Sequence, residues 1–169
     1  MQALSKPRLN LRPTLHIVRA TSLLKTNYSM NYDNSNIFAK ILRGEIPAHK
    51  IYEDDSTLAF LDIMPQADGH TLVIPKEPAT DLLSLSEAGA ADLIAKVQKI
   101  ARAVKTALNA DGITIFQLNG SAAGQTVGHI HFHVLPGSIL DARNHASVSA
   151  DKEHLAAIAE KIRTALGRT

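Results

Sequence analysis

The chain has 169 residues, enough for one compact domain but too few for two of ordinary size. Its formal net charge of +2, its 45% apolar residues and its 20% charged residues are ordinary for a globular protein, so we expect neither nucleic acid nor a membrane as a partner. Cysteine is absent, which excludes disulfides, thiolate catalysis and cysteine-built zinc sites.

The first residues of the chain are basic. Residues 1–32 contain no Asp or Glu but do contain Lys6, Arg8, Arg12, Arg19 and Lys25. Such a composition is compatible with a mitochondrial transit peptide. The sequence favours a plain N-terminal extension, or a start codon assigned too early with Met30 as the true start, because transit signals are weak compositional patterns. We therefore expect an extension over 1–33, a single domain over 34–169 and a cytoplasmic protein, or a mitochondrial one if the extension is a transit peptide.

The first half of the domain reads as a short helix followed by strands. A capping residue, apolar residues at helical spacing and Gly44 predict a short helix over 35–44. Two β-prone runs flank the turn-forming sequence Asp54-Asp55-Ser56 and predict a hairpin. A loop and a buried strand follow. The hairpin strands are expected over 49–53 and 57–62, the loop over 64–69 and the buried strand over 70–75.

The second half reads as two strands that lie between two helices. Ser84 and Glu87 form a capping-box pattern, and apolar residues at helical spacing then extend a long helix to Asn109 and Gly112. A last helix begins near Asp151 and ends at Gly167. Between them lie predicted strands over 113–118 and 129–135 and loops over 119–128 and 138–148. Strands joined by hairpins, with few helices, predict an α+β fold with a mostly antiparallel sheet.

Three of the eight histidines lie in the run GHIHFHVLP, residues 128–136. In a strand, side chains at i, i+2 and i+4 share one face, so His129, His131 and His133 should point one way. The apolar residues Ile130 and Phe132, together with Val134, should point toward the core. This alternation makes 129–135 the most informative segment of the chain.

Three interpretations of this histidine face compete. It could be a solvated polar face, although such faces usually carry Thr, Lys or Glu. It could hold a metal, but His129 and His133 would be about 13 Å apart, so a third ligand such as His70 would be needed. It could be a catalytic row along a phosphate-binding groove. A neutral imidazole can attack phosphorus, while a protonated neighbour binds phosphate oxygens or protonates a leaving group.

The preceding loop favours the catalytic interpretation. Residues 119–127, NGSAAGQTV, combine small residues with Gln125 and Thr126. Small residues let backbone N–H groups approach an anion closely, and the two polar side chains add donors. By itself such a loop could be only a flexible turn. Joined directly to the histidine run, it predicts a cradle for a phosphate group.

These residues resemble the histidine triad (HIT) family. GHIHFHVLP matches the family signature His-φ-His-φ-His-φ-φ, in which φ is apolar, and the order of three blocks also matches small HIT hydrolases of the Hint-like branch. The blocks are NIFAKILRGEIPAHKIYEDD (36–55), LAFLDIMPQADGHTLVIPKE (58–77) and LNGSAAGQTVGHIHFHVLP (118–136). The resemblance implies a five-stranded antiparallel sheet with one long and one or two shorter helices, and a homodimer that joins the sheets and packs the long helices.

The resemblance also implies a role for each site residue. His131 matches the nucleophile that forms a nucleotidyl-histidine intermediate. The backbone around His129 and the ring of His70 match the groups that hold its tautomer, and His133 matches a contact to the α-phosphate and leaving group. Asn119 matches a position that binds phosphate or supports the nucleophile. The remaining matches concern binding: phosphate for Gly124, Gln125, Thr126 and Val127, ribose for Asp62, and the base for Ile37, Phe38, Phe60 and Ile63.

One departure from the family pattern and two agreements with its hydrolases narrow the function. Many bacterial relatives complete a structural zinc site with Cys-x-x-Cys, but this chain has Asn36 and Ala39 at those positions, so we expect no metal and no other cofactor. The galactose-transfer branch has Gln at the third triad position, where this chain has His133. Retention of the three triad histidines and His70 favours catalysis over binding alone.

The resemblance therefore implies cleavage at the α-phosphate of a purine nucleoside phosphoramidate or a related nucleotide conjugate. Two alternatives stay open. One is hydrolysis of dinucleoside polyphosphates, and the other is a purine nucleotide-binding or interaction module with little turnover. A metal-binding protein is a further class, which predicts stoichiometric zinc after purification.

Overall fold

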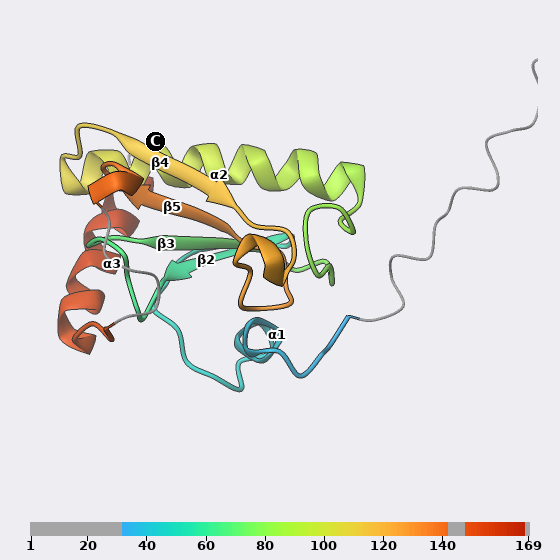
Figure 1. Cartoon of the computed structure of the whole chain (residues 1–169). Coiled ribbons are helices and arrows are strands. Elements are labelled where there is room, and N and C mark those ends of the chain that lie inside the picture. The colour runs from blue at the N-terminus through green and yellow to red at the C-terminus, as the bar shows by residue number, and fades with distance from the viewer. Residues whose placement is uncertain (1–31, 142–147, 168–169) are drawn as a thin grey trace, which may run out of the picture.

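A five-stranded antiparallel sheet forms the centre of the molecule, as the sequence predicts. The computed structural model describes residues 32–141 and 148–167. The strand order is β1-β2-β3-β5-β4, which places β3 and β5 in the interior of the sheet (Figure 1). The strands are β1 (Lys50–Glu53), β2 (Thr57–Leu61), β3 (Thr71–Pro75), β4 (Ile113–Gln117) and β5 (Phe132–Pro136).

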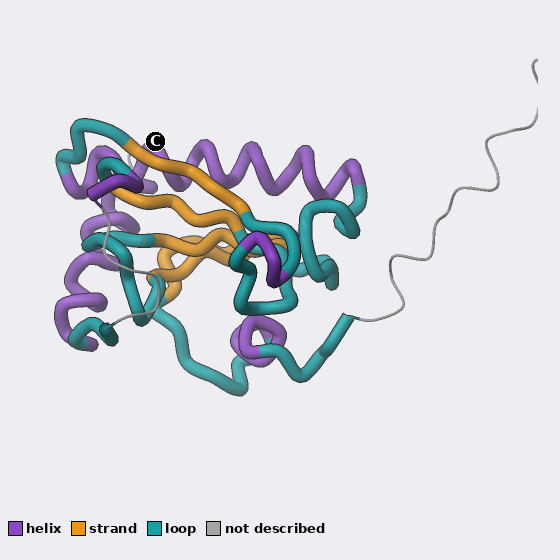
Figure 2. Tube along the Cα trace, viewed as in Figure 1, coloured by secondary structure: helices purple, strands orange, loops and turns teal. Residues whose placement is uncertain are grey.

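Helices cover both faces of the sheet, and the described residues include three α-helices, one of them long (Figure 2). The long helix α2 (Glu87–Leu108) and α3 (Lys152–Leu166) pack on one face, and α1 (Ile37–Leu42) lies on the other. Two short 3₁₀ turns, η2 (Ser121–Ala123) and η3 (Ile139–Asp141), flank β5 in the sequence. None of the described helices combines the length and the apolar character needed to cross a membrane.

Alternation along the strands divides the interior into two clusters. On β2, Ala59 and Leu61 join the cluster under α2 and α3, whereas Leu58 and Phe60 join the cluster under α1. Because both faces are buried, every residue of β2 and β3 is buried, and these strands read as continuous apolar runs. The site described below lies on the α1 side of the sheet.

The long helix begins two residues later than its capping box predicts. Ser86, not Ser84, is the N-cap, and its hydroxyl oxygen accepts the Gly89 N–H at 3.0 Å. Ser84 belongs instead to a turn with Asp81, whose carboxylate accepts the Ser84 N–H at 3.0 Å while its own N–H donates to the Ser84 hydroxyl at 3.1 Å. A local turn has therefore taken the residue that would otherwise cap the helix.

The histidine strand is also shorter than its sequence predicts. β5 begins at Phe132, whereas residues 129–131 lie outside the ladder. Its two neighbours explain the difference: β4 ends at Gln117, which pairs with Phe132, and β3 ends at Pro75, which has no N–H to donate. Ile130 donates its N–H to the Ala79 carbonyl oxygen at 2.9 Å instead.

The structure describes the predicted last helix but only the end of the predicted N-terminal extension. The last helix begins after Asp151, whose carboxylate accepts the N–H groups of Glu153 and His154, and Gly167 follows its end, as predicted. The basic residues of the expected extension lie outside the described part of the chain, as do residues 142–147 of the predicted loop. The division into 1–33 and 34–169 stays a prediction.

Candidate active site

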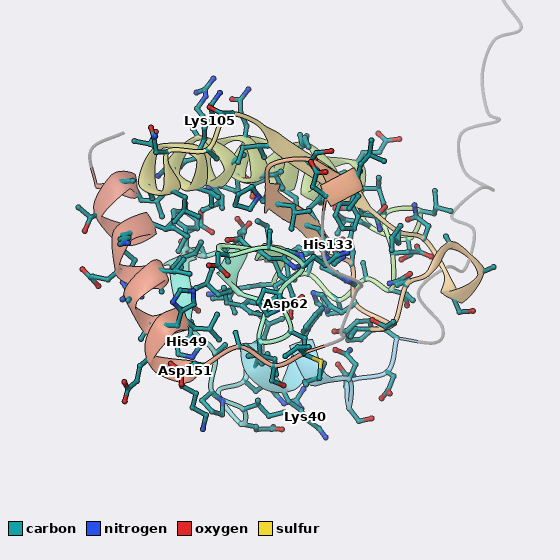
Figure 3. The ribbon with its side chains drawn as sticks, turned by 60° about the vertical axis from the view of Figure 1, so that its left-hand side comes forward. Lys40, His49, Asp62, Lys105, His133 and Asp151 are labelled. Carbon is teal, nitrogen blue, oxygen red and sulfur yellow. The ribbon has the colours of Figure 1, made fainter. Side chains whose placement is uncertain are left out.

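Four histidines lie close together, just before β3 and at the start of β5. His70 immediately precedes β3, and His129, His131 and His133 run from the preceding loop into β5. All four side chains are buried, so the histidine face is not a solvated surface. Figure 3 shows His133 and Asp62 toward the middle of the molecule, with Lys105 and Asp151 at its outside. The predicted alternation holds, since Ile130 and Val134 belong to the core cluster under α2 and α3.

A backbone hydrogen bond sets the tautomer of His131. Its Nδ1 lies 2.7 Å from the carbonyl oxygen of His129. A carbonyl oxygen only accepts, so Nδ1 carries the proton, and in the neutral ring the lone pair is on Nε2. The ring lines a cavity, described below, and its centroid lies 5.1 Å from that of Phe38 in an edge-on arrangement. The geometry therefore presents a nitrogen nucleophile at the cavity wall.

His70 and His133 form a second, directional chain of hydrogen bonds. The Gln66 N–H donates to His70 Nδ1 at 3.2 Å, so the proton of a neutral His70 is on Nε2. That Nε2–H donates to His133 Nδ1 at 2.9 Å, which places the proton of His133 on its Nε2. His133 also lines the cavity. The chain thus places a hydrogen-bond donor, Nε2–H of His133, beside His131, with the two ring centroids 4.9 Å apart.

His129 is not among the residues that line the cavity. Its Nε2–H donates to the Pro75 carbonyl oxygen at 2.9 Å, and its Nδ1 accepts from the hydroxyl of Tyr32. Burial is the main cause that lowers the pKa of His129, to about 4; the bond to the Pro75 carbonyl opposes it, and the proximity of His131 acts in the same direction as burial. His129 is therefore neutral at pH 7 and acts through its carbonyl oxygen.

The cavity beside the histidines is an apolar slot of about 210 Å³ between α1 and the sheet. Nine predicted site residues line it: Ile37, Phe38, Phe60, Asp62, Ile63, Thr126, Val127, His131 and His133. The wall further includes residues that sequence reasoning did not name, among them Ile41, Ile46 and Leu72. One end is polar, where Asp62 accepts the Met64 N–H at 2.9 Å and lies 3.4 Å from His70 Nδ1.

In the small-residue loop, residues 119–127, the side-chain donors of Gln125 bind backbone carbonyls of the protein itself. The side-chain amide of Gln125 donates to the carbonyl oxygens of Thr80 at 2.6 Å and Val127 at 2.8 Å, and its oxygen accepts the Gly120 N–H. Its donors therefore hold the loop together instead of pointing at a ligand. Among the other predicted residues, Asn119 accepts the Leu82 N–H at 3.0 Å and Gly124 ends η2 with φ 93°. Thr126 and Val127 alone bring this loop to the cavity.

The residues present do not fit the structural zinc site of the cysteine-containing relatives. Asn36 is the N-cap of α1, where its side-chain oxygen accepts the Ala39 N–H at 2.9 Å, and Ala39 has no ligand atom. Among residues 32–141 and 148–167, no three His, Asp or Glu side chains are grouped as a metal site requires. The hydrogen bond between His70 and His133 also places a proton between two nitrogens that a metal would need.

Sequence reasoning missed two aromatic residues that support the histidines. Phe116 stacks on His133 with centroids 4.2 Å apart and planes within 5°, and the two residues are register partners across β4 and β5. Tyr32 meets His129 edge-on at 5.5 Å. An alternating strand could have marked Phe116 as facing one side of the sheet, but nothing local shows that it faces a histidine.

The chain is similar to known proteins in both sequence and structure. The model of the HIT domain family matches residues 43–139, more than half of the chain. The adenosine 5'-monophosphoramidase hnt1 of Schizosaccharomyces pombe is 43% identical over 102 residues, which cover 60% of this chain and 74% of hnt1. The adenylylsulfatase HINT3 of Arabidopsis thaliana is 37% identical over 132 residues, covering 74% of this chain and 66% of HINT3.

Solved structures show the same fold. A Hit-like protein from Bartonella henselae, described as involved in cell-cycle regulation, superposes with a TM-score of 0.75 at 50% identity, over 79% of this chain and 98% of that one. A Zn-bound histidine triad family protein from Mycobacterium smegmatis gives a TM-score of 0.69 at 40% identity, over 79% and 94% of the two chains.

Proposed function

The chain belongs to the histidine triad family, and from its site we propose a nucleotide hydrolase or transferase that acts on a purine nucleoside phosphoramidate or a related conjugate. The proposal depends most on one observation, the bond from His131 Nδ1 to the carbonyl oxygen of His129. It places the lone pair of the neutral ring on Nε2, at the wall of a cavity. Relatives named as an adenosine 5'-monophosphoramidase and an adenylylsulfatase support a substrate cleaved at a nucleotide phosphate.

The reaction follows from the two chains of hydrogen bonds. His131 Nε2 attacks the α-phosphorus, and the bond from phosphorus to the leaving nitrogen breaks while a nucleotidyl-histidine forms. The proton for the leaving nitrogen comes from a His133 ring that carries a second proton in the reacting complex: this imidazolium gives up its Nε2–H and becomes neutral, and an amine departs. Water then attacks phosphorus, gives a proton back to His133 and releases the nucleoside monophosphate, which restores the neutral His131.

The cavity suits the nucleoside part of such a substrate. Aromatic and branched side chains, Phe38, Phe60 and Ile63 among them, form a slot for a planar base. The Asp62 carboxylate stands at its polar end, where it can accept from ribose hydroxyls. Thr126 lies at the cavity wall on the loop before the histidines, where its hydroxyl can donate to a phosphate oxygen.

We propose that the protein works as a homodimer through α2 and β4. β4 is an edge strand of the sheet, and Ile94 of α2 and Ile115 of β4 are both exposed. They line a shared groove with Ala101 and Ile113. Exposed apolar residues beside an unpaired strand edge favour pairing with a second copy. Sedimentation of the wild type and of Ile115→Lys measures this directly, and a wild-type monomer would contradict the proposal.

The decisive experiment measures AMP release from a fluorogenic adenosine phosphoramidate by wild type and His131→Ala. We expect turnover by wild type and a loss of at least about 1,000-fold in the variant, because a covalent nucleophile is removed. His154→Ala is the matched control, since this histidine is exposed on α3.

Three results would change the conclusion. Binding of AMP without turnover of the phosphoramidate or of diadenosine polyphosphates would show a binding module. Turnover of the diadenosine compounds alone would favour dinucleoside polyphosphate hydrolysis. Full activity in His131→Ala would show that the nucleophile is another residue.

A further inference from the structure

Tyr32 contacts the histidine row from outside the segment that the family model matches. It lies just before α1, whereas the matched segment begins at residue 43. Its hydroxyl forms a hydrogen bond with Nδ1 of His129, 97 residues later in the chain. The direction of this bond is fixed, because His129 Nε2 must donate to the Pro75 carbonyl and so leaves the lone pair on Nδ1. The tyrosine O–H is therefore the donor.

The residue that Tyr32 contacts also carries the carbonyl that orients the nucleophile. The peptide group joining His129 to Ile130 is held on both sides: its oxygen accepts from His131 Nδ1 at 2.7 Å, and its N–H donates to Ala79 at 2.9 Å. The ring of His129 is held at both nitrogens. Pro75 ends β3 and Ala79 lies shortly after it, so Tyr32 supplies the one contact among these that comes from the α1 side.

Tyr32 immediately precedes the turn that starts α1. The Asn36 N–H donates to the Asp33 carbonyl at 3.1 Å, and Asn36 caps the helix. Arg43, at the other end of α1, donates to the Asn34 carbonyl at 2.9 Å. These bonds fix residues 33–36 against the helix, directly after Tyr32, while the tyrosine ring itself contacts His129.

We propose that Tyr32 is a positioning residue for the nucleophile: its hydroxyl fixes the ring of His129, and through it the carbonyl that keeps His131 in the tautomer with the lone pair on Nε2. The inference rests on the proposed function only for its effect on turnover. The contact between Tyr32 and His129 can be measured whether or not the protein turns over a substrate.

The same contact keeps His129 neutral. An O–H donated to Nδ1 stabilises the neutral ring, because a proton on Nδ1 would displace the donor. Burial acts in the same direction and is the main cause of the low pKa of His129, about 4. The titratable groups that face His129 are Tyr32 and His131, and its other neighbours, Phe38 and the Pro75 carbonyl, carry no charge. Burial raises the pKa of Tyr32, so its hydroxyl keeps its proton at neutral pH.

The test compares Tyr32→Phe with Tyr52→Phe. Each substitution removes one phenol hydroxyl, and the Tyr52 hydroxyl donates to Asp54 at 2.7 Å, far from the histidines. We expect Tyr32→Phe to lower kcat about tenfold, as for loss of one hydrogen bond that leaves a buried acceptor unsatisfied. KM should stay within about twofold, because Tyr32 is not among the residues that line the base slot. Tyr52→Phe should change neither.

The second measurement is the ¹⁵N and ¹H NMR signal of the His129 ring as a function of pH. In Tyr32→Phe we expect the Nδ1 resonance to move and the pKa of His129 to rise above about 4, whereas Tyr52→Phe leaves both unchanged. Wild-type values of kcat and of the His129 pKa in Tyr32→Phe would overturn the proposal. If the wild type shows no turnover, the proposed function fails, and the NMR titration alone decides whether Tyr32 holds His129.

Discussion

The segment from Ile130 to Val134 has two faces that are equally buried but stabilised in different ways. Ile130 and Val134 are 0% exposed and pack under α2 and α3, while His131 and His133 are 5% and 2% exposed on the side of α1. The apolar face depends on volume and shape, which many side chains can supply. The histidine face depends on hydrogen bonds with fixed directions, each to one particular atom.

Because of this difference, we expect the chemistry and the stability of the fold to be separable. A lost methyl group in the apolar cluster leaves a cavity but no unsatisfied donor. A lost imidazole on the other face removes a reacting group or leaves a buried polar atom without its hydrogen bond. We therefore expect substitutions on the two faces to give opposite patterns of stability and turnover.

The largest expected effect on stability comes from Ile130→Ala. Truncating a fully buried isoleucine should reduce the free energy of unfolding by about 2–5 kcal/mol, because transfer and cavity terms add. At a temperature where the variant is folded, AMP release per molecule should stay within about tenfold of wild type, in contrast to His131→Ala. Urea unfolding and the phosphoramidate assay check both values. Loss of turnover as complete as in His131→Ala, from a folded variant, would show that the two faces are not separable.

A somewhat smaller effect should appear on acidification. The folded-state pKa of His129 is about 4, below its ordinary value of 6.5, so from pH 6.5 down to 4 the unfolded chain takes up a proton that the folded one does not. The free energy of unfolding should fall by about 3 kcal/mol across this window and be fully restored above it. Urea unfolding of wild type and His129→Gln at several pH values isolates this contribution. An identical pH dependence in the two proteins would contradict it.

The smallest effect should come from a histidine outside the row. His154, on α3, lies 3.1 Å from Asp68, and both side chains are about half exposed, at 51% and 55%. Exposed ion pairs are weak, so we expect His154→Gln to change the free energy of unfolding by less than about 0.5 kcal/mol. Turnover should be unchanged. A large loss of activity would show that this pair controls the loop that leads to His70.

Parts of the site could be predicted because their pattern is local. The alternation from His129 to Val134 gives the two faces of one strand without knowledge of its neighbours, and the strand keeps those faces although its ladder begins only at Phe132. Gln125 shows the limit of such reasoning. Its residue type indicates a donor, but its donors go to Thr80 and Val127, since the folded loop brings those carbonyls within reach.

The sequence by itself determined the antiparallel α+β fold and the core side of the histidine segment, because periodicity depends on neighbouring residues, and its resemblance to the HIT family implied the candidate nucleophile. Only the tertiary structure decided which atoms hold each ring. His70 meets His133 across 63 residues, Tyr32 meets His129 across 97, and Phe116 meets His133 through strand register. Such pairings depend on the packing of distant segments, and hydrogen-bond direction then sets the tautomer, which no local pattern encodes.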